Sequence, residues 1–120
     1  MQSLEGLTPL NAPKRRTTTG AKTPEGKVKQ QIRAIFDEFG AYVTMPATHG
    51  YGSSGVPDFL ACVNGKFVAV EAKSKLTSHG VTRLQEKNIH AIRNAGGIAI
   101  VVDEDNLDEL RTVLEGVTNG

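Results

Sequence analysis

The sequence predicts a single α/β domain in which a mixed sheet of about four strands has helices on both sides. Two apolar runs, 58–63 and 66–73, flank Asn64-Gly65, the dipeptide most typical of a two-residue hairpin turn. A third apolar run, 98–102, follows an amphipathic segment that closes at Gly96-Gly97. With capped helical patterns before, between and after these runs, the expected order is α-β-β-β-α-β-α.

The first helix has the clearest boundaries. Thr23 is suited to cap its N-terminus, Pro24 to occupy its first position and Glu25 its second, while Gly40 ends it. Apolar residues at helical spacing predict its buried face: Val28, Ile32, Ile35, Phe36 and Phe39.

The boundaries of the remaining elements are less clearly marked in the sequence. A short strand at 41–45 is expected before Pro46, followed by a polar, glycine-rich loop at 47–56. Thr82 is expected to cap a helix that runs to about Ala95, and Asp105 to cap a last helix. That last helix would turn Leu107, Leu110 and Leu114 inward. Residues 1–22 have no apolar period and are interpreted as a flexible basic tail, which leaves 23–116 as the domain.

Composition narrows the class of protein. The chain has 120 residues and a net charge of +1, which conceals an excess of positive charge in 1–24 and 66–93 and of negative charge in 103–115. No stretch approaches the roughly 20 apolar residues of a membrane helix. A single cysteine, Cys62, allows no internal disulfide and no cysteine-based zinc site, which fits a reducing cytoplasm. Basic segments are compatible with a polyanionic partner.

The hairpin register brings acidic residues together. A two-residue loop at Asn64-Gly65 sets Asp58 opposite Glu71, with Cβ atoms about 4.5–5.5 Å apart on one face. Lys73 lies two residues beyond Glu71 and therefore points to the same face. Two facing carboxylates repel each other and favour a shared proton or a bound cation. A simpler alternative is that the polar hairpin ends only reach solvent, with Lys73 pairing Glu71.

A hard divalent cation explains the three residues together. Mg²⁺ typically takes one or two carboxylates together with waters and substrate phosphate. A neighbouring lysine can meet the negative charge that develops during phosphodiester hydrolysis. The sequence therefore predicts a metal-dependent phosphodiesterase site with no covalent intermediate.

These residues also carry a family resemblance. Gly55-Val56-Pro57-Asp58 followed by Glu71-Ala72-Lys73 resembles the signature of PD-(D/E)XK nucleases. With Glu25, Gln85 and Ala95-Gly96-Gly97 in order around it, the chain is similar to the VRR-NUC branch over roughly residues 24–115. The resemblance implies a restriction-endonuclease-like αβββαβ core plus a C-terminal helix, and a Mg²⁺-dependent DNA endonuclease in which Mn²⁺ can substitute.

The resemblance implies a role for each matching residue. Asp58 and Glu71 would bind the metal with the backbone carbonyl of Ala72, and Lys73 would orient the attacking water or stabilise the transition state. Gln85 would support Lys73 or the phosphate.

Glu25 would add a carboxylate to the metal's outer shell or to a second metal position. Two of these assignments have structural alternatives. Glu25 also suits a helix N-terminus and lies one turn before Lys29, and Thr82 with Gln85 forms a capping box.

Basic residues on the two helices and in the tail are candidate DNA contacts, although ordinary surface charge explains them as well. The candidates are Lys75, Lys27, Lys29, Arg33, Arg83, Lys87, Lys14, Arg15 and Arg16. No base-reading element is evident, so structure-specific cutting of branched or junction DNA is expected.

Family members that stand alone are viral or bacterial and often dimeric, which implies a homodimer in the cytoplasm of a bacterial or phage-infected cell. No membrane and no small-molecule cofactor are expected. The alternative is a non-catalytic DNA-binding module that retains the fold.

Two competing patterns are weak. Gly50 to Gly55 matches GxGxxG, but it leads into Val56-Pro57 and a strand, so no helix follows to cap a pyrophosphate. A loop beside the active face, with Tyr51 near the DNA backbone or merely connecting, is the better interpretation. His49, His79 and His90 lack the spacing of metal ligands.

Overall fold

Four strands form one mixed sheet in the order β1-β2-β3-β4. The strands are β1 (Tyr42–Thr44), β2 (Phe59–Val63), β3 (Lys66–Ala72) and β4 (Ile98–Val102). The first three are antiparallel neighbours, and β4 lies parallel to β3. This computed structural model describes residues 23–47 and 55–120. The predicted tail with Lys14, Arg15 and Arg16, and the loop segment with His49 and Tyr51, lie outside the described residues.

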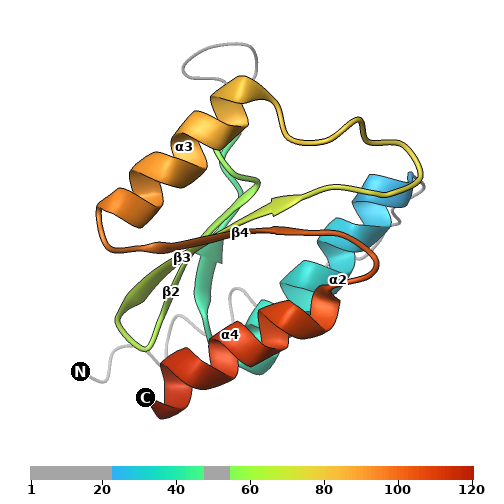
Figure 1. Cartoon of the computed structure of the whole chain (residues 1–120). Helices are drawn as coiled ribbons and strands as arrows, with labels where there is room; N and C mark the ends of the chain where they lie inside the picture. The colour runs from blue at the N-terminus through green and yellow to red at the C-terminus, as the bar shows by residue number, and fades with distance from the viewer. Residues whose placement is uncertain (1–22, 48–54) are drawn as a thin grey trace.

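Helices cover both faces of the sheet (Figure 1). Helices α2 (Pro24–Glu38) and α4 (Leu107–Asn119) pack on one face, and α3 (Arg83–Asn94), which connects β3 to β4, packs on the other. The larger core lies on the α2–α4 side and contains most of the apolar residues predicted for the two helices, including Ile32, Phe36 and Leu110. The α3 side has a smaller cluster around Ala69, Ile89 and Ala99. The predicted α/β class and element order are confirmed.

The hairpin turn has the predicted geometry and register. Asn64 and Gly65 adopt φ of 50° and 82°, the two positive values that a type I′ turn requires. Val63 pairs with Lys66, and the ladder continues to Phe59 opposite Val70. The Asn64 side-chain amide donates to the carbonyl of Val117 at 2.9 Å, which ties the turn to the end of α4.

Helix boundaries agree with the capping signals at two of three sites. Thr23 Oγ1 accepts from the Gly26 N–H at 3.0 Å, and Thr82 with Gln85 forms a complete capping box. Asp105, expected to cap the last helix, does not do so: α4 begins at Leu107 with Asn106 in the N-cap position. The Asp105 carboxylate is instead paired with the Lys75 ammonium, a long-range contact that local sequence does not reveal.

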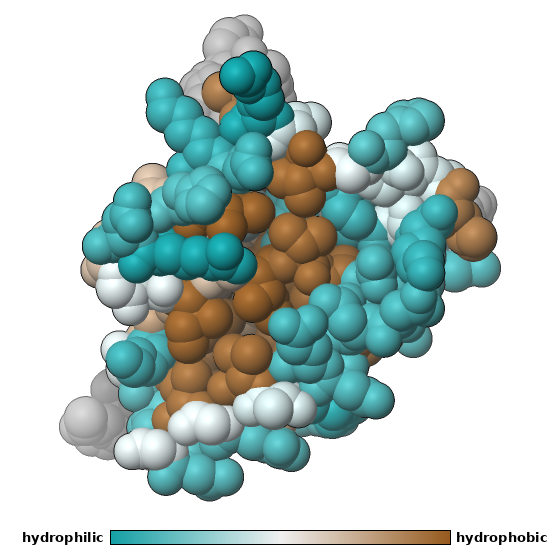
Figure 2. All heavy atoms as spheres, viewed as in Figure 1, coloured by the Kyte–Doolittle hydropathy of each residue, from teal (hydrophilic) through white to brown (hydrophobic). Residues whose placement is uncertain are grey.

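The outer edge of β4 has its carbonyls occupied by side chains. Arg93 donates to the Ala99 carbonyl at 3.0 and 2.7 Å, and the Asn106 amide donates to the Val101 carbonyl at 2.9 Å. Unpaired edge groups are a template for pairing with other chains, so these contacts protect the edge. An apolar band nevertheless follows β4 between α3 and α4 (Figure 2), where Ile98, Ile100 and Val101 are half-buried.

None of the helices within residues 23–47 and 55–120 is long and apolar enough to cross a membrane.

Gly55 is required by both its conformation and its surroundings. Its φ is +86°, and a Cβ there would lie 2.6 Å from the backbone carbonyl group of Leu84 in the first turn of α3. The segment that leads into β2 therefore packs directly on the N-terminus of α3.

Three glycine-to-alanine substitutions should separate the cost of a positive φ from the cost of a backbone clash. Gly55→Ala should be the most destabilising because it combines a backbone clash with a positive φ. Gly65→Ala, with open space around the Cβ, should cost only the positive φ, about 1–2 kcal/mol. Gly116→Ala, in open space on α4, should stabilise by about 0.5–1 kcal/mol. Urea unfolding measures all three, and a Gly55→Ala variant as stable as Gly65→Ala would contradict the packing argument.

Candidate active site

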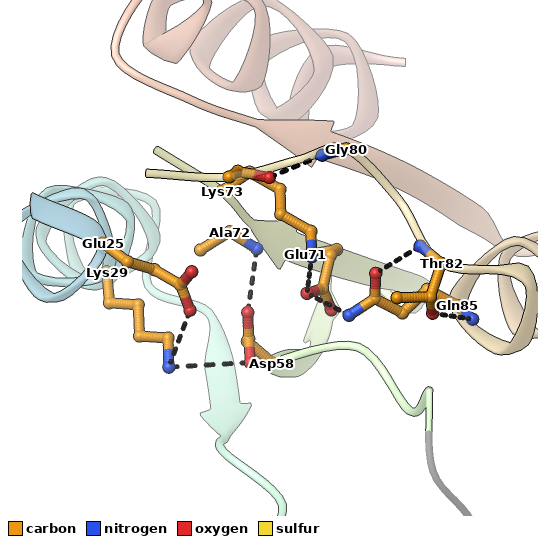
Figure 3. Close-up of polar contacts among 10 residues, drawn as sticks. Glu25, Lys29, Asp58, Glu71, Ala72, Lys73, Gly80, Thr82 and Gln85 are labelled. Carbon is orange, nitrogen blue, oxygen red and sulfur yellow. Dashed lines mark hydrogen bonds and ion pairs between the residues drawn. The ribbon is translucent and has the colours of Figure 1, made fainter. Parts of the chain in front are cut away.

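Asp58 and Glu71, the acidic pair, meet at the end of the hairpin opposite its turn. Asp58 lies one residue before β2, and its Oδ2 accepts a hydrogen bond from the Ala72 N–H at 2.9 Å. This contact holds the Asp58 carboxylate beside the last residues of β3 (Figure 3). The two acids that the register predicted to face each other are therefore adjacent in the structure.

Glu71 is buried, which separates it from ordinary strand-end acids. Its side chain is 5% exposed, and its Oε2 lies 3.0 Å from Gln85 Nε2 and 3.7 Å from Lys73 Nζ. Its Oε1 is buried with no hydrogen-bond partner among the described residues. The simpler alternative from the sequence is thus half right: Lys73 does pair with Glu71, but this acid does not reach solvent.

Burial raises the pKa of Glu71 from 4.5 to about 7. Loss of hydration is the largest cause, and the charge of Asp58 is the second. The Lys73 ammonium opposes both, Glu25 adds a smaller increase, and the nearby polar backbone N–H of Asp58 lowers the pKa slightly. Glu71 therefore ionises reluctantly in this site.

Lys73 leaves the strand with its side chain turned back toward Glu71 (Figure 3). Its backbone N–H donates to the Val102 carbonyl at 2.9 Å, which extends the pairing of β3 with β4 by one residue. The side chain is 17% exposed. The lysine is thus held in position, with one side accessible from solvent.

Gln85 performs two tasks with the two atoms of its amide. Its Oε1 accepts from the Thr82 N–H at 2.9 Å within the capping box, and its Nε2 donates to Glu71. The sequence resemblance implied support of Lys73 or the phosphate, whereas the structure places Gln85 on Glu71, on the same oxygen that Lys73 approaches. Gly55 contributes indirectly, because its close approach to Leu84 and Gln85 fixes this end of α3.

The N-terminus of α2 supplies Glu25 and Lys29. Lys29 Nζ lies 3.5 Å from Glu25 Oε2 and 3.7 Å from Asp58 Oδ1. The pairing of Lys29 with Glu25 was expected from their spacing, but the contact with Asp58 was not. No local signal could have revealed it, since it depends on how α2 packs beside the sheet.

The acidic pair fits a single divalent cation. Among the described residues, no three His, Cys, Asp or Glu side chains form a group that could hold a metal. Mg²⁺, however, commonly uses only one or two carboxylates and completes its shell with waters and phosphate. A buried carboxylate oxygen without a partner, next to a second carboxylate, is the arrangement that a cation stabilises. Asp58 and Glu71 would hold it, with the Ala72 carbonyl as the ligand that the resemblance implies.

A hollow of about 320 Å³ opens beside Lys73. It is lined by Lys73, Ser74, Lys75, Ser78, Gly80, Val81, Val101 and Asp103. Glu104 fixes one wall, because its carboxylate accepts from Ser74 Oγ at 2.5 Å and from the Lys75 N–H at 2.8 Å. These hydrogen bonds, that of Ser74 first, lower the pKa of Glu104.

The remaining candidate DNA contacts differ in their availability. Lys75 is paired with Asp105, and Arg33 lies 3.5 Å from Asp37 on the same helix. Lys27, Arg83 and Lys87 are exposed and form no ion pair with another described residue. These three are free to contact a phosphate.

Comparisons with known proteins identify the fold. No protein-family model matches the sequence, and no curated protein was found to be similar. A solved structure described as "VRR_NUC domain" superposes with a TM-score of 0.60 at 24% identity, covering 78% of this chain and 97% of its own. The chain therefore has the VRR_NUC fold, as its motifs predicted.

The pKa of Glu71 predicts how stability depends on pH. A carboxyl whose pKa is about 7 when folded and 4.5 when unfolded binds protons more tightly in the folded state. Its contribution to stability is present at about pH 4.5 and falls as the pH rises to about 7, by at most about 3 kcal/mol.

The melting temperature of the metal-free protein should therefore fall more between about pH 5 and pH 8 than that of Glu71→Gln, which carries no ionisable group there. The comparison cancels the other titrating groups. Parallel pH profiles for the two proteins would show that Glu71 ionises normally.

Proposed function

We propose that this chain is a metal-dependent endonuclease that hydrolyses DNA phosphodiester bonds. The observation that carries the proposal is the buried Glu71 carboxylate near Asp58. One of its oxygens has no hydrogen-bond partner among the described residues, and the other lies near the Lys73 ammonium group. The likeness of the fold to the solved structure described as "VRR_NUC domain" supports the proposal.

Each residue of the site has a distinct task in this reaction. Asp58, fixed by the Ala72 N–H, and Glu71, fixed by Gln85, present carboxylate oxygens to a cation, Mg²⁺ or Mn²⁺. A divalent cation in such a site lowers the pKa of a bound water and neutralises phosphate charge. Lys73 Nζ stabilises the charge that develops on the phosphate oxygens or orients the attacking water. No residue is required to form a covalent bond with the substrate.

Glu25 belongs to the outer part of the site in this proposal. Its carboxylate is 39% exposed and reaches Asp58 only through Lys29. A water-mediated role toward the cation, or a second metal position, is consistent with this place. Helix stabilisation by its negative charge at the N-terminus of α2 operates in either case.

DNA would approach the end of the sheet where α2 and α3 begin. The exposed Lys27, Arg83 and Lys87 lie on these two helices, and the hollow beside Lys73 adds Lys75 at its rim. Contacts with phosphates carry no sequence information, so cutting directed by DNA structure, at branches or junctions, is favoured. The proposed setting is the cytoplasm, where the free Cys62 stays reduced.

A homodimer would present two such sites to a branched substrate. The half-buried apolar side chains along β4 offer a surface for a second copy (Figure 2). Light scattering at micromolar concentration tests this assembly, and a monomer alone would argue against it.

Replacing Lys73 separates the enzyme from a DNA-binding module. Lys73→Ala should slow nicking of supercoiled plasmid in Mg²⁺ by about 10²–10³-fold, because the charge on the transition state loses its partner. DNA retention in gel-shift assays should change little. The control is Lys66→Ala, which removes an exposed lysine at the hairpin turn, far from the acidic pair. Wild-type protein that retards plasmid without cutting it, with and without EDTA, would instead favour the non-catalytic module.

The role of Gln85 can be separated from helix capping with Thr82. Gln85→Ala and Thr82→Ala each disrupt the capping box, at a cost of about 1 kcal/mol. Only the first also removes the hydrogen bond to Glu71. Plasmid nicking should therefore fall further in Gln85→Ala, at similar melting temperatures. Equal loss of activity in the two variants would mean that Gln85 acts only through the helix.

A further inference from the structure

Lys29 contacts the one Asp58 oxygen that the backbone leaves available. Asp58 Oδ2 is engaged by the Ala72 N–H, whereas Oδ1 lies 3.7 Å from Lys29 Nζ. On Glu71, Oε2 is engaged by Gln85 and Lys73, whereas Oε1 has no partner among the described residues. The two oxygens that no hydrogen bond among the described residues engages are thus Asp58 Oδ1 and the buried Glu71 Oε1, and the first already faces an ammonium group.

The charges around the site explain why a lysine is held there. The charges of Glu25 and Asp58 both act on Glu71 at this end of the sheet, and each raises the cost of ionising it. Within residues 23–47 and 55–120 the ammonium of Lys73 pairs with Glu71 alone, so Lys29 is the group that offsets the charge of Glu25 and Asp58 (Figure 3). Its side chain is 32% exposed and flexible enough to move away.

We propose that Lys29 occupies the place of the divalent cation at Asp58, so that metal binding must displace its ammonium group. This inference rests on the metal site proposed above. Lys29 then sets how tightly the site binds metal: it stabilises the metal-free acids and competes with the cation for Asp58 Oδ1. Once displaced, its charge remains next to the site, on the helix that is proposed to meet DNA phosphates.

The competing interpretation is that Lys29 only pairs with Glu25 one turn away on the same helix, or that it orients Asp58 for the metal. Helix pairing alone predicts no effect on metal affinity. Orientation predicts weaker metal binding when Lys29 is removed. Competition predicts the opposite sign, so a binding measurement distinguishes all three.

The experiment measures Mn²⁺ binding by calorimetry on DNA-free protein, with Lys29→Gln, Lys29→Arg and Lys66→Gln as variants. Lys29→Gln should bind Mn²⁺ about three- to tenfold more tightly than wild type, from the loss of one partly exposed ion pair and of repulsion toward the cation. Lys29→Arg keeps the positive charge and should remain near wild type. Lys66→Gln makes the same charge change at the far end of the hairpin and should also remain near wild type.

Melting temperatures provide a second measurement of metal binding, and like calorimetry they do not depend on nuclease activity. Metal-free Lys29→Gln should melt below wild type because Glu25 and Asp58 lose their counter-charge, and Mn²⁺ should raise its melting temperature by more than it raises that of wild type. Equal or weaker Mn²⁺ binding by Lys29→Gln, with wild type binding normally, would overturn this inference and leave the metal site standing. Absence of Mn²⁺ binding in every variant and in wild type would overturn both proposals.

Discussion

The burial of one carboxylate constrains the whole active end of this fold. Glu71 is the penultimate residue of β3, an inner strand of the sheet, where water reaches it poorly, and its pKa rises to about 7 as a result. A group in that state needs compensation, which comes from Gln85 on α3 and from Lys73, the residue that follows β3. The proposed cation would add to it at Oε1, which has no hydrogen-bond partner among the described residues. A buried acid with incomplete compensation costs stability, and sites that perform chemistry commonly carry such a cost.

The turn, the strands and the helix N-termini together position Asp58, Glu71 and Gln85 at one end of the sheet. The two-residue turn at Asn64-Gly65 sets the β2–β3 pairing, and that pairing delivers Asp58 to Ala72 and Glu71. The two helix N-termini flank the same end of the sheet, so their partial positive charges lie near the acids. Gly55 allows the chain before β2 to lie against the first turn of α3, which couples the position of Asp58 to that of Gln85.

Two lysines divide the charge of the site between them. Lys73 is the more buried and approaches the carboxylate oxygen that Gln85 also contacts, which suits the role proposed for it in the reaction. Lys29 is more exposed and bridges two acids on different elements. A fixed lysine can assist in the reaction, whereas a mobile lysine is suited to exchange with a cation. The difference in exposure, 17% against 32%, is the physical basis for assigning them different roles.

Local sequence patterns alone were sufficient to predict the hairpin register, the starts of two helices and most of the core. The turn dipeptide fixed the hairpin register, capping residues fixed where α2 and α3 begin, and the apolar spacing identified the core. That register was sufficient to bring Asp58, Glu71 and Lys73 together, because a ladder next to a two-residue turn leaves no freedom in which residues face each other.

Contacts between separate elements were decided only by the tertiary structure. Asp105 pairs with Lys75 instead of capping α4, and the Gln85 amide donates to Glu71. Lys29, on α2, lies near Asp58, which precedes β2. Each of these depends on how a helix or loop packs against the sheet, which follows from burying the whole core at once. The residues next to these side chains in the sequence do not indicate how the elements pack. The folded structure alone therefore reveals the partners of these side chains and the burial that shifts the pKa of Glu71.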